Sequence, residues 1–133
     1  MKLYIPEIGD ELRLIENWTF DLYNEDRNST IMEFMGDPRE VVWIKQTAIP
    51  TTVVAGSILK VDRIYIRKGA GDYSSITFFW KGMRTNPKMV ERWKTLYHGT
   101  HHSDSKEMVK QPARAVRFWA KLADVNNIVF EPV

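Results

Sequence analysis

The chain has 133 residues, of which 44% are hydrophobic and 27% are charged, as in an ordinary globular domain. It contains no cysteine, which excludes a disulfide scaffold, a thiolate zinc site and a cysteine nucleophile. No stretch of about 18 residues is apolar enough to span a bilayer, and the first residues lack the apolar run of a signal peptide. We therefore expect one small β-barrel domain over residues 1–133, a cytoplasmic location and no membrane contact.

The net charge of +2 hides an uneven distribution along the chain. Residues 1–40 hold four basic and ten acidic side chains, a net of −6, whereas residues 41–133 hold fifteen basic and seven acidic ones, a net of +8. Either an acidic edge and a basic face neutralise each other within one domain, or the basic part is a surface for an anionic partner.

Short runs rich in β-branched and aromatic residues alternate with turn signals along most of the chain. The predicted strands are LRLI (12–15), WTFDLY (18–23), TIMEF (30–34), VVWIKQTAI (41–49), ILKVDRIYIRK (58–68), YSSITFFW (73–80), VRFWAKL (116–122) and IVF (128–130). Short strands at this spacing predict a mainly β fold, specifically a small and partly open barrel of the SH3-like or OB-like kind.

Two of these runs are built alike. The matching positions are Gly9-Leu12-Arg13-Leu14 and Gly56-Leu59-Lys60-Val61. The match predicts two similar strands, each entered through a tight glycine turn.

Within the second of the two runs, the alternation of apolar residues switches from one face of the predicted strand to the other. Leu59 and Val61 alternate in one phase, whereas Ile64 and Ile66 alternate in the other. Because the side-chain period of a strand is two, the change requires an extra residue, and we expect a β-bulge near 62–63.

One segment has the periodicity of a helix, and we predict a helix over 87–97. Asn86 and Pro87 suit its N-terminus, and Gly99 suits its C-terminus. The apolar residues at three- and four-residue spacing are Met89, Val90, Trp93, Leu96 and Tyr97. A second short helix is possible over 103–111, before Pro112.

The last predicted elements lie in RFWAKLADVNNIVF, residues 117–130. Over about fourteen residues this stretch resembles, in layout only, the closing strand, single helical turn and final short strand of SH3-like barrels. The resemblance implies a strand, a turn of helix and a short strand in that order.

All three histidines of the chain lie close together. With a nearby acid they form a group of possible metal ligands, His98, His101, His102 and Asp104. A helix that ends at Gly99 leaves them in a connecting loop, where neighbouring side chains do not readily point at one ion. We therefore expect a solvated, metal-free loop that is dispensable for folding, and no cofactor. A weak metal site, or a nuclease centre with or without metal, is the alternative.

Alternation within the strands predicts a basic and aromatic face. The expected inward residues are Ile64, Ile66, Ile76, Phe78, Trp80, Val116, Phe118, Ala120 and Leu122. On the strand at 73–80, Ser75, Thr77 and Phe79 then point outward. The candidate binding residues on the outward face are Arg63, Tyr65, Arg67, Phe79, Lys81, Arg117, Trp119 and Lys121.

Cations beside flat rings suit single-stranded nucleic acid, because base stacking contributes about 1–3 kcal/mol per base. The sequence thus predicts a non-catalytic module that binds single-stranded nucleic acid. A protein-binding accessory or inhibitor protein, of the small kind that phage genomes encode, is the main alternative, since Trp, Tyr and Arg are common at interface hot spots. The same rings and arginine stems also pack for stability alone.

Overall fold

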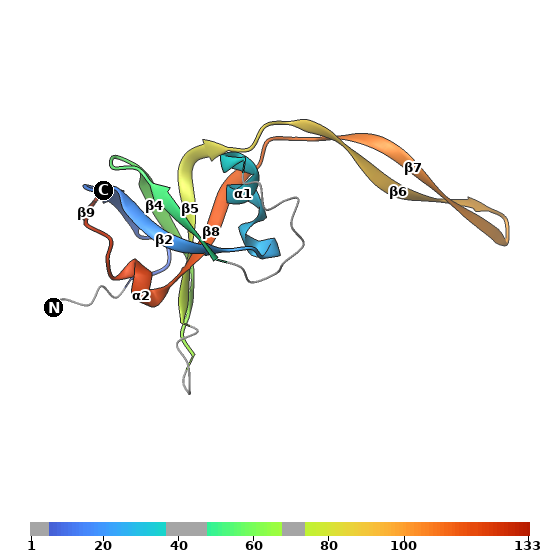
Figure 1. The fold of residues 1–133 in the computed structure, drawn as a ribbon. Coiled ribbons are helices and arrows are strands. Elements are labelled where there is room, and N and C mark those ends of the chain that lie inside the picture. Colours follow the sequence, from blue (N-terminus) through green and yellow to red (C-terminus); the bar gives the residue numbers. More distant parts are fainter. Residues whose placement is uncertain (1–5, 37–47, 68–73) are drawn as a thin grey trace.

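The computed structural model describes residues 6–36, 48–67 and 74–133. They form a compact body from which one long hairpin projects (Figure 1). The body contains β1 (Glu11–Leu14), β2 (Trp18–Tyr23), η1 (Asp26–Asn28), α1 (Ser29–Met35), β3 (Ala48–Val53), β4 (Ile58–Tyr65), β5 (Ser75–Arg84), β8 (Ala115–Lys121), α2 (Leu122–Val125) and β9 (Phe130–Pro132). The projecting hairpin consists of β6 (Lys88–His98) and β7 (His101–Gln111).

The main sheet of the body has five strands in the order β8-β5-β4-β1-β9, and all of its strand pairs are antiparallel. A second sheet pairs β2 with β3. The fold is mainly β, as predicted, and the sheets formed by the described residues stay open instead of closing into a barrel.

The core lies between the two sheets. The ring of Phe20 on β2 stacks on that of Phe118 on β8, with centroids 5.1 Å apart. Trp18 meets Phe78 of β5 edge to face, with centroids 6.1 Å apart. Burial of a side chain of this size contributes about 1.5–3 kcal/mol, so these rings hold the sheets together.

Strand alternation was predicted correctly for two neighbouring strands of the main sheet, β5 and β8. The inward residues of β5 (Ile76, Phe78 and Trp80) and of β8 (Val116, Phe118 and Ala120) are all buried. The expected bulge is confirmed, since the register of the β4–β5 pair shifts between Val61 and Arg63. The C-terminal layout is confirmed as well, with β8, α2 and β9 following one another.

The predicted helices at 87–97 and 103–111 are wrong, because these segments are the strands β6 and β7. Met89, Trp93 and Tyr97 recur every four residues, and a spacing of four keeps residues on one face of a strand as well as near one face of a helix. Gly99 is compatible with either a helix or a hairpin, because its φ of 65° occurs both at the C-terminal end of a helix and in a two-residue hairpin turn. The segment forms a strand because β7 pairs with it across the turn.

The predicted strand TIMEF is also wrong, because it belongs to the helix α1. This helix lies along the outer edge of β8, where Ile31 and Met32 enter the core. The Thr30 hydroxyl donates to the Arg117 carbonyl at 2.9 Å and accepts from the Arg117 amide at 2.8 Å. These tertiary contacts outweigh the strand preference of the segment. Most of the predicted strand at 41–49 lies outside the described residues, and Ala48 and Ile49 belong to β3.

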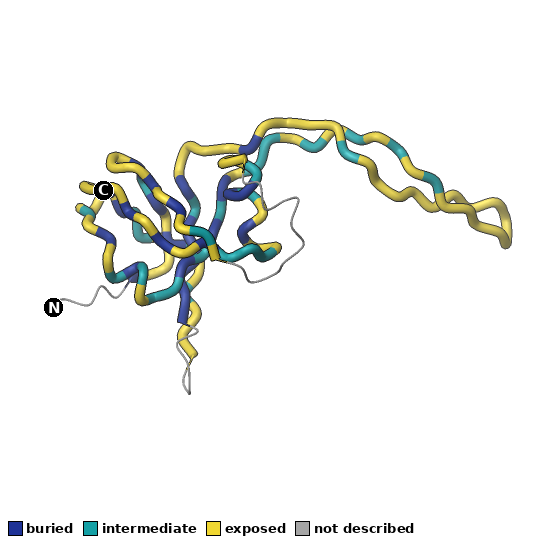
Figure 2. The backbone as a smooth tube through the Cα atoms, in the orientation of Figure 1, coloured by how far each residue is buried: buried dark blue, intermediate teal, exposed yellow. Residues whose placement is uncertain are grey.

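Burial differs sharply between the body and the hairpin. More and less buried positions alternate along most strands of the body, whereas the hairpin is exposed along most of its length (Figure 2). We call β6 and β7 together the arm. Among the described residues, no helix is both long and apolar enough to cross a membrane.

Candidate nucleic-acid interface

The outward side chains of β4, β5 and β8 form rows across the main sheet. β4 and β8 are not neighbours, because β5 lies between them, but the pairing places their outward residues on one face. The rows are Lys60–Phe79–Arg117, Arg63–Thr77–Trp119 and Tyr65–Ser75–Lys121. Residues at the two ends of a row are two strand spacings apart, about 10 Å. We call this surface the row face.

The exposed members of the row face lie mainly on β4. The side chain of Arg63 is 74% exposed and Tyr65 is 55% exposed. The small residues Ser75 and Thr77 on β5 were expected to be exposed but are buried. Both have cross-strand neighbours with longer side chains on β4 and β8.

The predicted inward phase of β4 holds only as far as Ile64, which packs against the core. Ile66 was expected to face the core but is 61% exposed, because the strand ends at Tyr65. Arg67 is exposed just beyond that strand end.

Trp119 is only partly exposed, and its ring is occupied within the molecule. It stacks on Tyr23 of β2 with centroids 5.3 Å apart and ring planes 4° apart. The guanidinium carbon of Arg27 lies 5.4 Å from the centre of the Trp119 ring. Tyr23 and Arg27 therefore belong to the site, although their strand and turn are remote in sequence. Alternation in β2 marks Tyr23 as outward-facing but gives no sign of what it faces.

Lys121 completes this aromatic and cationic cluster. Its Nζ lies 5.0 Å from the centre of the Tyr23 ring. A hydrogen bond with Tyr23 raises the pKa of Lys121, and the nearby carboxylates of Asp124 and Asp21 raise the pKa further, against the opposing effect of burial. Lys121 thus stays charged at neutral pH, and nearby carboxylates of the same chain partly offset its positive charge.

Several cations of the site have carboxylate partners. Arg117 lies 3.1 Å from Asp62, the residue at the bulge. Lys81 lies 2.7 Å from Glu11. Its hydrogen bond lowers the pKa of Glu11.

Arg27 pairs with Glu25 in the same way, and the hydrogen bond raises the pKa of Arg27. Arg63 differs from these cations, since it is 3.9 Å from Asp62 and mostly exposed. Of the predicted cations, Arg63 is therefore well placed to meet an anionic ligand.

The histidine cluster lies at the tip of the arm, and not in an irregular loop. His98 and His101 are cross-strand partners beside the turn and so share one face. His102 pairs with Tyr97 on the opposite face, where Asp104 accepts a hydrogen bond from the Thr95 hydroxyl at 3.0 Å. The four candidate ligands are therefore divided between two faces. Within residues 6–36, 48–67 and 74–133, no three His, Cys, Asp or Glu side chains are grouped so that they could hold a metal ion.

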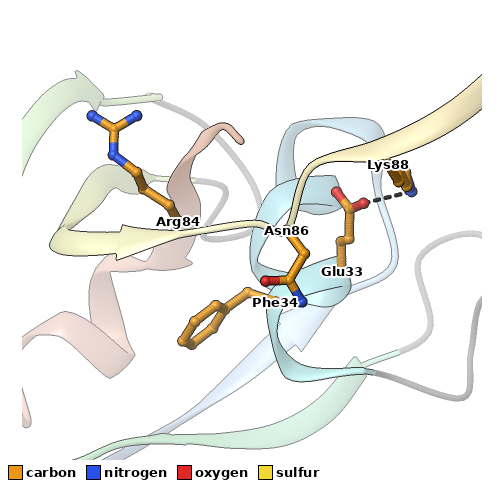
Figure 3. A pocket seen from close by; sticks show the side chains of 5 residues that line it. All are labelled: Glu33, Phe34, Arg84, Asn86 and Lys88. Carbon is orange, nitrogen blue, oxygen red and sulfur yellow. Dashed lines mark ion pairs between the residues drawn. The ribbon is translucent and has the colours of Figure 1, made fainter. Parts of the chain in front are cut away.

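A pocket lies where the arm joins the body. It is lined by Glu33, Phe34, Arg84, Asn86 and Lys88 (Figure 3). The Glu33 carboxylate points toward Lys88 at the start of β6, at 2.5 Å, and also pairs with Arg114 beyond the end of β7, at 2.6 Å. Glu33 thus links α1 to both ends of the arm, and its two ion pairs help to hold the arm on the body.

Comparisons with protein families, with characterised proteins and with solved structures gave no match to this chain.

Proposed function

We propose that this protein is a non-catalytic module that binds single-stranded nucleic acid on the row face. The observation that carries the proposal is the register of β4, β5 and β8, which aligns cations and rings in rows on one surface. Phosphates need cations at intervals along the strand, and bases need flat rings on which to stack.

The charge of the row face supports an anionic ligand. The basic residues on the outward side of the three strands are Lys60, Arg63, Lys81, Arg117 and Lys121. The acid that these strands present beside them is Asp62, which pairs with Arg117. The exposed ring nearest to Arg63 along β4 is that of Tyr65, so we assign base stacking to Tyr65 and phosphate contact to Arg63.

This assignment differs in one respect from the expectation drawn from the sequence. Trp119 was among the rings expected to meet the ligand, but its ring is stacked on Tyr23. We therefore give Trp119 the role of supporting the face, with Tyr65 as the ring that meets the ligand.

The proposal is tested by fluorescence anisotropy with labelled oligothymidylate and oligouridylate over a range of salt concentrations. Tyr65→Ala is expected to weaken binding by about 1–3 kcal/mol, the contribution of one stacked base. Arg63→Ala is expected to reduce the slope of log affinity against log salt by about 0.7, as for one lost phosphate contact on a single strand.

Arg13→Ala is the matched control. Arg13 is an exposed arginine of the same sheet, paired with Glu131 at 3.1 Å on the β1–β9 edge. Its replacement should leave both the affinity and the salt slope unchanged. Absence of binding to either strand at low salt, or equal effects of the three substitutions, would refute the proposal.

A further inference from the structure

The bulge in β4 places one carboxylate among the cations of the row face. Its neighbours Val61 and Arg63 pair with consecutive residues of β5, which leaves no residue opposite Asp62. Bulges re-aim a side chain in this way, and they are over-represented next to active sites. The position of Asp62 is therefore set by the irregularity of the strand and not by simple alternation.

Two arginines approach the same oxygen of this carboxylate. Arg117 Nε on β8 lies 3.1 Å from Asp62 Oδ2, and Arg63 Nε lies 3.9 Å from it. Because β5 lies between β4 and β8, the contact with Arg117 spans the middle strand of the row face. The two cations hold the carboxylate on the surface where the ligand is expected.

The capacity of Asp62 to accept hydrogen bonds is unused within the described part of the chain. Arg117 Nε has no hydrogen-bond partner there, so its approach to Oδ2 is an ion pair without hydrogen-bond alignment. An ionised carboxylate offers two oxygens and only accepts. The Asp62 side chain is 26% exposed, so a ligand on the row face can reach it.

A carboxylate in this place disfavours phosphate and favours the donor groups of bases. Like charges repel, so Asp62 weakens the attraction of the face for the nucleic-acid backbone. The groups from which a carboxylate can accept are the N–H groups of the bases, and the amino group of cytosine is a usual partner of Asp and Glu. In a single strand this group lies on an unpaired Watson–Crick edge and is open to the protein.

The spacing along β4 separates the carboxylate from the stacking ring. Tyr65 lies three residues beyond Asp62, about 10 Å along the strand. Arg63, which is 74% exposed, lies between them. Asp62 and Tyr65 are thus spaced for two different bases of one strand, with the phosphate contact of Arg63 between them.

We propose that Asp62 recognises the base next to the one stacked on Tyr65, and that it prefers a base with an exocyclic amino group, which among the pyrimidines is cytosine. Cytosine carries an amino donor at position 4, where uracil carries a carbonyl oxygen that the carboxylate repels. This inference rests on the function proposed above and adds the class of single strand that the site prefers.

Fluorescence anisotropy with labelled oligodeoxycytidylate and oligodeoxyuridylate of equal length tests the preference at neutral pH. The two ligands share one backbone and one ring size, so the ratio of their affinities isolates the edge of the base. Wild type is expected to bind the cytosine strand about tenfold more tightly, the difference made by one hydrogen bond to a charged group. Asp62→Asn should bring this ratio close to unity, because an amide donates to the uracil oxygen as readily as it accepts from the cytosine amino group.

Glu11→Gln is the matched control. Glu11 also pairs with a cation of the site, Lys81, at 2.7 Å, so this substitution removes the same charge as Asp62→Asn. It should change the affinities for the two strands by equal factors and leave their ratio at the wild-type value. Thermal melting of both variants checks that the fold is intact, and the wild-type ratio is measured without any variant.

The outcomes separate this inference from the function on which it rests. Equal binding of the two strands by wild type, in an interaction that still depends on Tyr65 and Arg63, would overturn the inference and leave the proposed function in place. A preference for cytosine that survives Asp62→Asn would also overturn it, because another group would then recognise the base. So would an equal gain in affinity for both strands in that variant, which would show that Asp62 acts by repulsion alone. Binding of neither strand would overturn the proposed function, and this inference with it.

Discussion

Leu12 of β1 and Leu59 of β4 lie directly opposite each other, and the strand pairing on either side of them is symmetric. Glu11 faces Lys60 on one side, and Arg13 faces Ile58 on the other. The two segments that look alike in the sequence are thus partners in the sheet, related by a local two-fold axis between the two leucines.

The symmetry extends to the glycine turns, and it gives a matched pair of substitutions. Gly9 N donates to Val61 O at 2.8 Å, and Gly56 N donates to Leu14 O at 2.7 Å. The φ angles of the two glycines are 93° and 88°, and no atom lies within 4 Å of an added Cβ at either position.

Gly9→Ala and Gly56→Ala should therefore each lower the free energy of unfolding by about 1–2 kcal/mol, through backbone strain alone. Urea denaturation of both single variants and of the double variant tests this. Unequal costs would show that the two turns are not equivalent.

Asn28 is expected to be among the polar residues to which stability is most sensitive. It is fully buried, its Nδ2 donates to Tyr23 O at 3.0 Å, and its Oδ1 accepts from Trp119 N at 2.9 Å. Asn28→Ala leaves both backbone groups without these partners, and we expect a loss of about 2–4 kcal/mol. The exposed neighbour Ser29 provides the control, because Ser29→Ala should change the melting temperature little.

Trp119→Ala should destabilise the fold by about 1–3 kcal/mol, because the ring is partly buried and stacked on Tyr23. Trp119→Phe should retain most of this stability. Trp119 Nε1 is buried and has no hydrogen-bond partner among the described residues, so replacing the indole by a phenyl ring removes no hydrogen bond. Thermal melting separates the two variants, and equal melting temperatures for Ala and wild type would contradict a supporting role.

Glu33→Gln should make the attachment of the arm weaker in a pH-dependent way. Burial alone would raise the pKa of Glu33, but hydrogen bonds from Lys88 and Arg114 outweigh it and hold the pKa below the ordinary value of 4.5. Because the folded-state pKa is lowered, the stabilisation is complete above pH 4.5 and is lost as the pH falls through the lowered pKa.

We therefore expect Glu33→Gln to cost about 1–2 kcal/mol at neutral pH and progressively less in acid. Chemical denaturation at several pH values measures this difference. Glu91→Gln serves as the control, since the Glu91 side chain is 63% exposed and its ion pair with Lys106 is long. A cost that does not change with pH would contradict the role of the charge.

The features that could be predicted from the sequence are those set by local alternation. The inward residues Phe78 and Phe118 and the bulge after Val61 follow from a side-chain period of two. The stacking of Tyr23 on Trp119 could not be predicted, because it depends on how two sheets pack across most of the chain length. For the arm, Trp93 and Tyr97 fit a helix and a strand equally well until a pairing partner is known.

The unbroken pairing of the arm restricts how its length can change during evolution. Every residue from Lys88 to His98 has a partner from His101 to Gln111, with no bulge between them. A single inserted residue would turn the side chains beyond it to the opposite face, so Met89, Trp93 and Tyr97 would no longer all lie on one face of the arm. Insertions or deletions of two residues in each strand preserve both faces. Related chains should therefore carry arms whose strands differ in length by even numbers of residues.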